Sequence, residues 1–150
     1  MPRRAPLAIL MASPEDIEAQ FYEALQSADL ERLVALWIGD EEVRCIHPGG
    51  PLLIGISAIR ASFETLFARG PMAIEPTEAR KLQTEQMAVH QLKERILVRG
   101  PEGLQMAWVQ ATNVYLKTAE GWRMVLHHAS PGQAAESLDI QPNGGSDTLH

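Results

Sequence analysis

The spacing of apolar residues changes at Gly70 and Pro71, where a helical pattern ends and a strand-like pattern begins. Beyond this point we predict four long strands, at residues 72–83, 86–99, 103–118 and 121–130. The segments between them are turn sequences, so successive strands are expected to pair as antiparallel hairpins. Pro76 has no backbone N–H to donate, so we expect it at a sheet edge or at a bulge.

The part of the chain before Pro71 is predicted to hold three helices and two short strands. Ser13 suits the N-cap of the first helix, and Pro14 suits its first turn. A second helix is expected from Asp29, and a third helix follows Gly55. The short strands are predicted at residues 42–46 and 52–54.

Helices early in the chain and long antiparallel strands late in the chain indicate the α+β class. A curved sheet with the helices on its concave face would leave a pocket between the two layers. We expect one domain at residues 13–131, preceded by a flexible extension at 1–12. Residues 132–150 contain little apolar material and are expected to form a flexible or peripherally docked tail.

Charge and composition exclude several classes of protein. The formal net charge of −6 argues against a nucleic-acid binder and gives no reason to sit on an anionic membrane. No apolar run approaches the roughly 20 residues of a membrane span. The single cysteine, Cys45, leaves no internal disulfide and favours a cytoplasmic location. The short apolar segment near the N-terminus is broken by Pro6, so we do not expect a signal peptide.

A short strand ends at His47, where the sequence continues as Pro-Gly-Gly-Pro. Pro48 cannot extend the hydrogen-bonding ladder, and the two glycines permit positive φ. The turn therefore holds the imidazole firmly at the end of a strand. Two interpretations stay open from this segment: a functional histidine, or a histidine whose ring bonds the backbone of its own turn.

The order of elements resembles the nuclear transport factor 2-like superfamily, and within it the SnoaL-like and ketosteroid-isomerase-like bacterial branch. The resemblance covers roughly residues 13–131. The segments that carry it are Phe-Tyr-Glu-Ala-Leu-Gln-Ser-Ala-Asp-Leu-Glu-Arg-Leu-Val-Ala-Leu-Trp at 21–37, Cys-Ile-His-Pro-Gly-Gly at 45–50, Gly55, and Gly-Trp-Arg-Met-Val-Leu-His-His-Ala-Ser at 121–130. The resemblance implies a cone-shaped curved antiparallel sheet with three N-terminal helices enclosing a deep apolar pocket. It also implies a dimer interface on the outer face of the sheet.

The isomerase's catalytic positions are changed in this chain. The general-base Asp of that branch falls on His47, its oxyanion-hole Asp on Asn113, and its oxyanion-hole Tyr on Phe21, one residue before Tyr22. An authentic ketosteroid isomerase is therefore not expected. Imidazole can still take up a proton near neutral pH, and an amide can donate to an oxyanion. His47 and Asn113 are thus the catalytic candidates, with a backbone-bonding role open for Asn113.

Other side chains are candidates for the wall of the pocket. His127 and His128 are adjacent on a strand, so only one can face inward. We expect His128 inward, on the same face as Trp122. Cys45 lies two residues from His47, and we favour a buried small side chain over a nucleophilic pair. Phe21, Tyr22, Trp37, Cys45, Trp108 and His128 complete the predicted ligand-binding set.

Charged and metal-binding groups give weaker indications. Glu94 and Arg95 lie in the middle of a strand and point to opposite faces, so one of them must meet the pocket or an interface. The sequence does not decide which. The histidines have no i, i+4 pair and no evident carboxylate partner, so no metal and no cofactor are expected.

The function that these features favour is the binding of a small apolar metabolite, with isomerase, cyclase or dehydratase chemistry as the catalytic form. The alternatives are a non-catalytic binding module and an assembly domain. Strands 86–99 and 103–118 carry apolar residues on both faces, for example Trp108 and Val114 on one face. Because a large exposed apolar patch usually marks an interface, we expect a homodimer built on the outer face of the late strands.

Overall fold

The computed structural model describes residues 12–132 and 136–137. The predicted extension at 1–12, apart from Ala12, lies outside the described residues. So does the predicted tail, apart from Gly132 and residues 136–137. The order of elements is α2, α3, β1, β2, α4 and then β3 to β7. It confirms the predicted α+β sequence of short strands among helices, followed by long strands.

The helices begin where the sequence predicts. Helix α2 spans Pro14–Ser27, α3 spans Leu30–Ala35 and α4 spans Ile56–Phe67. The Ser13 hydroxyl accepts from the Asp16 backbone N–H at 3.2 Å, and the Asp16 carboxylate accepts from the Ser13 N–H at 3.1 Å. This reciprocal capping box satisfies two backbone donors at the start of α2. Asp29 caps α3 in a similar way, accepting from the Arg32 N–H.

The sheet has the strand order β2-β1-β6-β5-β4-β3. Its strands are β1 (Arg44–Ile46), β2 (Leu52–Ile54), β3 (Ile74–Gln83), β4 (Met87–Gly100), β5 (Gly103–Thr118) and β6 (Gly121–Pro131). The successive late strands pair as antiparallel hairpins, as predicted. Strand β1 pairs in parallel with β6, so the sheet is mixed. Pro76 lies on the edge strand β3, one residue before a shift in register, as its missing donor requires.

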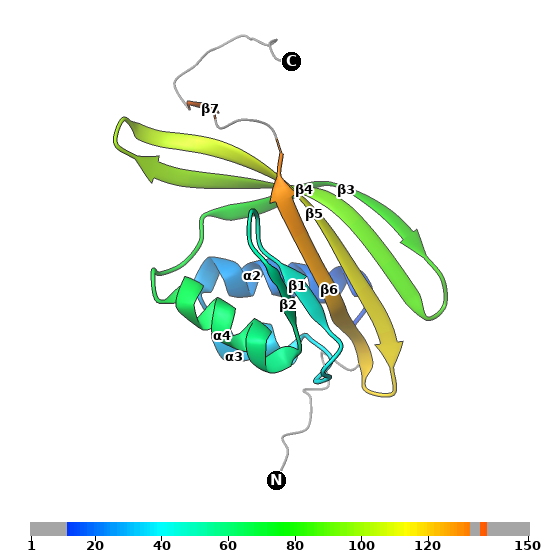
Figure 1. The fold of residues 1–150 in the computed structure, drawn as a ribbon. Coiled ribbons are helices and arrows are strands. Elements are labelled where there is room, and N and C mark those ends of the chain that lie inside the picture. Colours follow the sequence, from blue (N-terminus) through cyan, green and yellow to red (C-terminus); the bar gives the residue numbers. More distant parts are fainter. Residues whose placement is uncertain (1–11, 133–135, 138–150) are drawn as a thin grey trace.

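Two layers make up the domain (Figure 1). Helices α2, α3 and α4 lie on one side of the curved sheet, and the far end of the β4–β5 hairpin extends past them. The two-residue strand β7 (Glu136–Ser137) pairs with β5 near that end.

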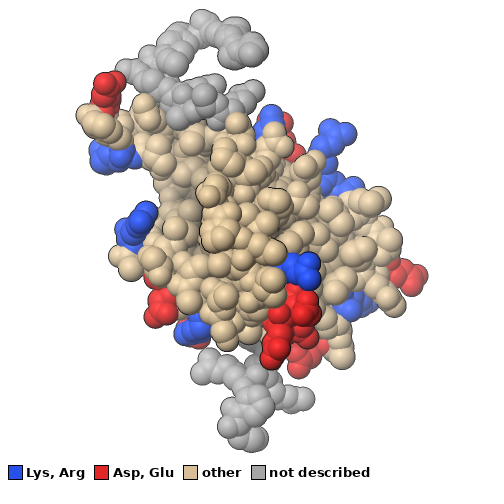
Figure 2. Space-filling view, viewed as in Figure 1, with Lys and Arg blue, Asp and Glu red and all other residues tan. Residues whose placement is uncertain are grey.

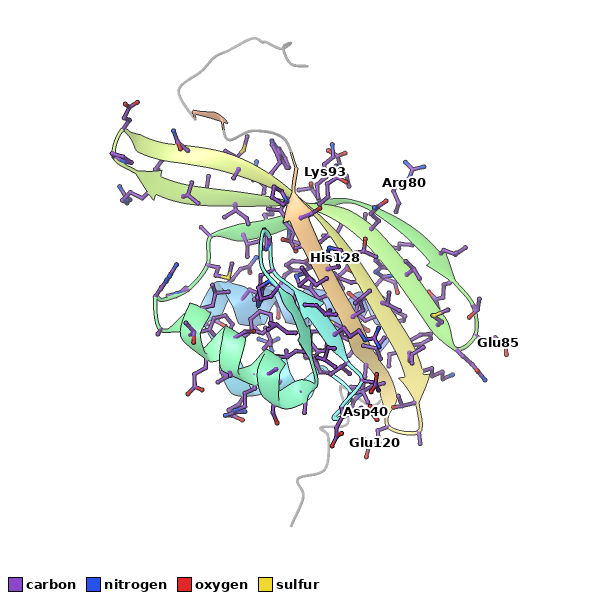
Figure 3. The ribbon with its side chains drawn as sticks, in the orientation of Figure 1. Asp40, Arg80, Glu85, Lys93, Glu120 and His128 are labelled. Carbon is purple, nitrogen blue, oxygen red and sulfur yellow. The ribbon has the colours of Figure 1, made fainter. Side chains whose placement is uncertain are left out.

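Acidic side chains gather at the lower edge of the face in Figure 2, where Figure 3 labels Asp40 and Glu120. In the described part of the chain, no helix is both long and apolar enough to cross a membrane.

The faces of the sheet differ in burial, because side chains alternate along each strand. On β4 the buried positions are Ala88, His90, Leu92 and Glu94, and on β5 they are Val109, Ala111, Asn113 and Tyr115. These residues define the inner face, which the helices cover. Phe21, Leu33, Ile59 and Phe63 from the helices are also buried and contribute to the core. The side chains between those positions on the strands define the outer face.

Candidate functional site

Polar side chains from four elements meet in the interior between α2 and the inner face. We call this group the interior polar cluster. Its members are Glu18 and Tyr22 from α2, His90 and Glu94 from β4, Asn113 and Tyr115 from β5, and His127 from β6. All but Glu18 are at most 4% exposed, and the Glu18 side chain is 12% exposed. Buried polar groups are costly unless they are paired, so this concentration marks the interior as the candidate site.

Local geometry explains why these residues converge. Glu18 and Tyr22 are four residues apart, so they lie on the same side of α2. His90 and Glu94 share the inner face of β4, and Asn113 and Tyr115 share that of β5. His90 pairs with Asn113 in the β4–β5 register, and Asn113 pairs with His127 in the β5–β6 register.

Glu94 is the centre of one half of the cluster. The Tyr22 hydroxyl donates to Glu94 Oε2 at 2.7 Å, and His127 Nε2 lies 3.9 Å from the same oxygen. Burial raises the pKa of the Glu94 carboxyl to about 7, although the hydrogen bond from Tyr22 lowers it. The carboxyl group is therefore poised to gain or lose a proton near neutral pH, which ordinary glutamates are not.

Glu18 is the centre of the other half. Its Oε1 accepts from the Tyr115 hydroxyl at 2.8 Å and lies 2.9 Å from His90 Nδ1 and 3.4 Å from Asn113 Nδ2. A carboxylate oxygen accepts, so His90 Nδ1 carries the donated proton. His90 Nε2 is buried and has no hydrogen-bond partner among the described residues. Glu15 Oε2 lies 3.8 Å from this nitrogen.

Asn113 joins the two halves. Its amide nitrogen donates to the Tyr22 hydroxyl oxygen at 3.3 Å and lies 3.4 Å from Glu18, and its amide oxygen lies 2.6 Å from His127 Nδ1. The amide oxygen accepts, so His127 is the Nδ1–H tautomer. Burial lowers the pKa of His127 to about 3, and the nearby His47 and His128 act in the same direction. His127 is therefore neutral, with the Nε2 lone pair on the side of Glu94.

The expectation that His128 faces inward is wrong. Val114 pairs with Leu126 while Tyr115 pairs with Met124, so Val125 is an extra residue in β6. This bulge reverses the alternation along the strand. Met124 and His127 are consequently buried, and His128 is exposed on the outer face. Figure 3 labels His128 on the ribbon of β6.

The His47 side chain lies against helix α4. Its Nε2 is 3.0 Å from the Ser62 hydroxyl oxygen, and its ring packs edge-on against Phe63 with centroids 4.9 Å apart. The Ser62 hydroxyl donates its own proton to the Ile59 carbonyl at 2.8 Å, so His47 Nε2 is the donor and Nδ1 keeps its lone pair. Burial lowers the pKa of His47. Among the described residues, no hydrogen bond joins His47 to Asn113.

The remaining predicted residues take different positions. Phe21 and Trp37 are core side chains, and Phe21 packs against the His127 ring with centroids 5.0 Å apart. Tyr22, beside Phe21, is the aromatic residue that reaches Asn113. Burial raises the pKa of the Cys45 thiol to about 12, which supports a packing role. Trp108 alternates with the buried Val109 and therefore lies on the outer face, away from Asn113.

Three members of the cluster, Glu18, His90 and Tyr115, are not indicated by the sequence, and the sequence leaves open whether Glu94 or Arg95 faces inward. Glu94 is the inward residue, and Arg95 pairs with Glu75 on the outside. The sequence signal for Glu94 is its place in the middle of β4, where it continues the every-second-residue spacing of the buried positions. No group of metal-ligating side chains with suitable geometry occurs in the portion of the chain described.

Comparisons with known proteins agree with this architecture. The family model for the SnoaL-like domain matches residues 15–134. A candidate calcium/calmodulin-dependent protein kinase type II association domain from Thiobacillus denitrificans is 35% identical, with a TM-score of 0.73 over 81% of this chain and 96% of that chain. A candidate dehydratase of the NTF2-like family from Streptomyces avermitilis is 30% identical, with a TM-score of 0.71 over 80% of this chain and 94% of that chain.

A longer plant protein shares part of its length with this chain. F-box protein SKIP8 from Arabidopsis thaliana is 25% identical over an alignment 127 residues long, and the match covers 76% of this chain and 47% of the plant protein. The chain thus spans about half the length of this curated relative.

Proposed function

Because the chain belongs to the SnoaL-like domain family and has the NTF2-like fold, we propose that it binds a small, mainly apolar molecule in its interior and transfers a proton on it. The observation that carries this proposal is the buried Glu94 carboxyl at 2.7 Å from the Tyr22 hydroxyl. A carboxyl with a pKa near 7 beside two hydrogen-bond donors is suited to enolisation, isomerisation or dehydration of a carbonyl or hydroxyl compound.

The roles divide according to the chemistry of each group. Glu94 takes a proton from carbon and returns it, because its pKa lies near neutrality. Tyr22 and Asn113 both carry donors that can turn from their present acceptors to a substrate oxygen. His127 accepts at Nε2 and can hold the Glu94 proton in place. Phe21, which packs on His127, and Phe63, which packs on Phe21, offer apolar contacts to the ligand.

We transfer the acid–base role from His47 to Glu94 and retain Asn113 as donor. His47 donates to Ser62, lies 4.0 Å from Cys45 Sγ through the same Nε2 and packs on Phe63. Among the described residues, no hydrogen bond joins its side chain to a member of the interior polar cluster. We propose that His47 orders the wall of the site beside Cys45, whose strand position pairs with His127.

The test combines ligand screening with isotope exchange. A thermal-shift screen of apolar ketones, aromatic polyketide-like compounds and terpenoid epoxides should identify binders, because ligands stabilise the folded state. With a binding ketone, NMR should show exchange of the acidic C–H proton for deuterium by the native protein. Glu94→Gln should reduce that rate by about 10²-fold or more. Glu85→Gln, in an exposed turn, is the matched control. An unchanged rate in Glu94→Gln would contradict the assignment.

Self-association is a second candidate function, and a specific surface favours it. On the outer face Leu82, Val89, Val114 and Leu126 are successive cross-strand partners on β3, β4, β5 and β6. We call this line the outer apolar row. Leu82 is 72% exposed, and Met87 beside it is 42% exposed. The likeness to a candidate association domain supports self-association of this chain. The outer apolar row is the surface that we propose for a homodimer.

A further inference from the structure

A β-bulge in the edge strand β3 creates a second candidate site, on the opposite face from the interior polar cluster. Thr77 pairs with Lys93, whereas Arg80 pairs with Gln91. From Thr77 to Arg80 the β3 strand advances by three residues, while its partner β4 advances by two. The β3 strand therefore contains one extra residue at this point. Glu78 in the bulge has a φ of 53°, a left-handed conformation that side-chain-bearing residues seldom adopt. Strained residues and bulges of this kind often occur where a side chain is redirected for function.

The bulge changes which residues share a face. In a regular strand, residues three apart point to opposite faces. Here the register puts Thr77 and Arg80 on the same outer face, beside Lys93 and Gln91 respectively. Lys93 in turn pairs with Gln110 on β5, so the side-chain amide of Gln110 lies on the same outer face. Without the extra residue, Arg80 would point toward the helices.

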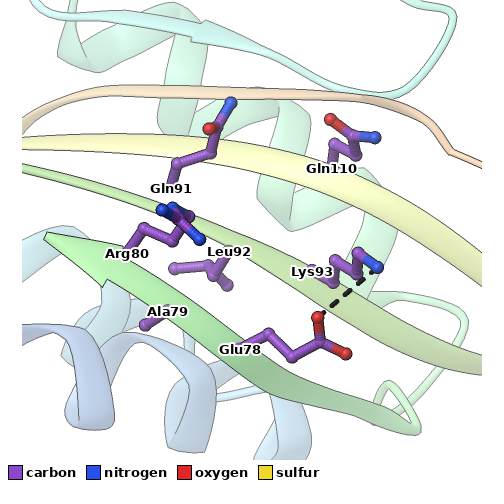
Figure 4. A pocket seen from close by; sticks show the side chains of 7 residues that line it. All are labelled: Glu78, Ala79, Arg80, Gln91, Leu92, Lys93 and Gln110. Atoms are coloured by element: carbon purple, nitrogen blue, oxygen red, sulfur yellow. Dashed lines mark ion pairs between the residues drawn. The ribbon is translucent and has the colours of Figure 1, made fainter.

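The side chains at the bulge surround a hollow of about 480 Å³ (Figure 4), lined by Glu78, Ala79, Arg80, Gln91, Leu92, Lys93 and Gln110. We call it the bulge groove. Among the described residues, the Arg80 guanidinium and the side-chain amides of Gln91 and Gln110 make no hydrogen bond or ion pair. Lys93 lies 3.4 Å from Glu78. The lining therefore carries two cations and one anion, in a chain whose net charge is −6.

We propose that the bulge groove binds a small dianion, a phosphate- or dicarboxylate-bearing molecule. Arg80 offers a planar fork of N–H donors that matches two oxygens of one phosphate or carboxylate group. The free amides of Gln91 and Gln110 supply further N–H donors, and Lys93 supplies a mobile point charge. Glu78 holds Lys93 in the unliganded state and opposes an incoming anion. The site is independent of the proposed proton transfer, since it lies on the other face of the sheet.

The experiment is calorimetric titration of the full chain with inorganic phosphate at pH 7, with sodium chloride adjusted to constant ionic strength. Succinate in a parallel titration distinguishes the dicarboxylate from the phosphate source. The variants are Arg80→Gln, Arg80→Lys and Glu78→Gln. Arg99→Gln is the control, because Arg99 is an exposed arginine of the neighbouring strand β4 and lies outside the groove.

Saturable binding of one of the two probes is expected for the native chain. Arg80→Gln should weaken it about tenfold or more, and Arg80→Lys should lose part of the affinity because an ammonium group cannot bind two oxygens side by side. Glu78→Gln should tighten binding about threefold, since it removes a competing carboxylate. Arg99→Gln should stay within about twofold of the native value.

Three results would overturn the proposal. The first is unsaturable heat for both probes in the native chain. The second is equal weakening by Arg80→Gln and Arg99→Gln, which would indicate a diffuse charge effect. The third is a change of molar mass in Arg80→Gln measured by light scattering without added anion, because a carboxylate of a second copy would then be the occupant. Glu94→Gln should bind the probes like the native chain. A negative result for proton transfer would therefore leave the anion-binding result unchanged.

Discussion

The Tyr22 hydroxyl donates to the Glu94 carboxyl across the interior of the domain, joining helix α2 to strand β4 at 2.7 Å. These residues are 72 positions apart in the chain. The contact therefore forms only when the helical layer has packed on the sheet. It couples the protonation state of Glu94 to the packing of α2, so the ionisation of one buried carboxyl is linked to folding.

We predict that Glu94 makes the protein less stable as the pH rises from about 5 to 8. The folded-state pKa of Glu94 is about 7, above its ordinary 4.5, so the native state binds the proton more tightly than the unfolded chain between these values. Ionisation in this window therefore costs stability. Glutamine cannot ionise, so Glu94→Gln does not lose this stability. The free energy of unfolding of the variant, minus that of the native chain, should therefore increase by about 2–3 kcal/mol from pH 5 to pH 8. Urea unfolding at both pH values measures this difference.

The comparison with the variant is needed because histidines act in the opposite direction. The pKa of His127 is lowered to about 3, so its contribution to stability is present above pH 6.5 and is lost as the pH falls toward 3. The native profile is the sum of both effects. A difference between the two proteins that stays constant from pH 5 to pH 8 would contradict the raised pKa of Glu94.

We predict that Tyr22→Phe raises the pKa of Glu94 further and destabilises the fold. The hydrogen bond from Tyr22 favours the ionised carboxylate, and its loss removes that effect. Leaving a buried acceptor short of a donor costs about 1–3 kcal/mol. Carboxyl-carbon NMR should show the Glu94 midpoint moving upward. Tyr115→Phe is the matched control, because its hydroxyl donates to Glu18 and not to Glu94. Equal shifts in both variants would argue against the specific contact.

We predict that His47 contributes to stability, and that the contribution disappears in acid. Burial lowers the pKa of His47 below 6.5, so the native state disfavours its protonated form. The stabilisation from neutral His47 is therefore present above pH 6.5 and is lost as the pH falls through the folded-state pKa. Ser62→Ala removes the acceptor of Nε2 and should cost about 1 kcal/mol at neutral pH. His47→Ala should cost more, because it also removes the contact with Phe63. A thermal melt unchanged in both variants would restore the alternative of a histidine held free for catalysis.

The fold could be predicted from the sequence because its signals are local. The change of period at Pro71, the cap at Ser13 and the turn residues each act within a few residues, and the observed helices and strands follow them closely. The interior polar cluster could not be assembled in this way. Glu18 and Tyr115 are 97 positions apart, and only the register of β4, β5 and β6 brings their partners together.

The error at His128 has a similar physical cause. Regular alternation along β6 would put His128 on the same face as Trp122, but the extra residue Val125 reverses the face of every residue after it. A bulge of this kind has no Gly or Pro to indicate it in the sequence. Pro76 does indicate an edge or a bulge in β3, but it does not show that Glu78 takes the positive φ, because glutamate rarely adopts that conformation.

We predict that the chain forms a homodimer through the outer apolar row. Four apolar side chains in one cross-strand line, with Leu82 72% exposed, form a surface that water solvates poorly. Light scattering at micromolar concentration should therefore give a dimer of the 16.5 kDa chain. Val114→Glu adds a charge in the middle of the row, and a desolvated unpaired charge opposes association, so this variant should be a folded monomer. Gln86→Glu adds the same charge in an exposed turn and should remain dimeric. Cooperative unfolding of Val114→Glu would show that its core is intact. A native chain that scatters as a monomer would refute association through this face.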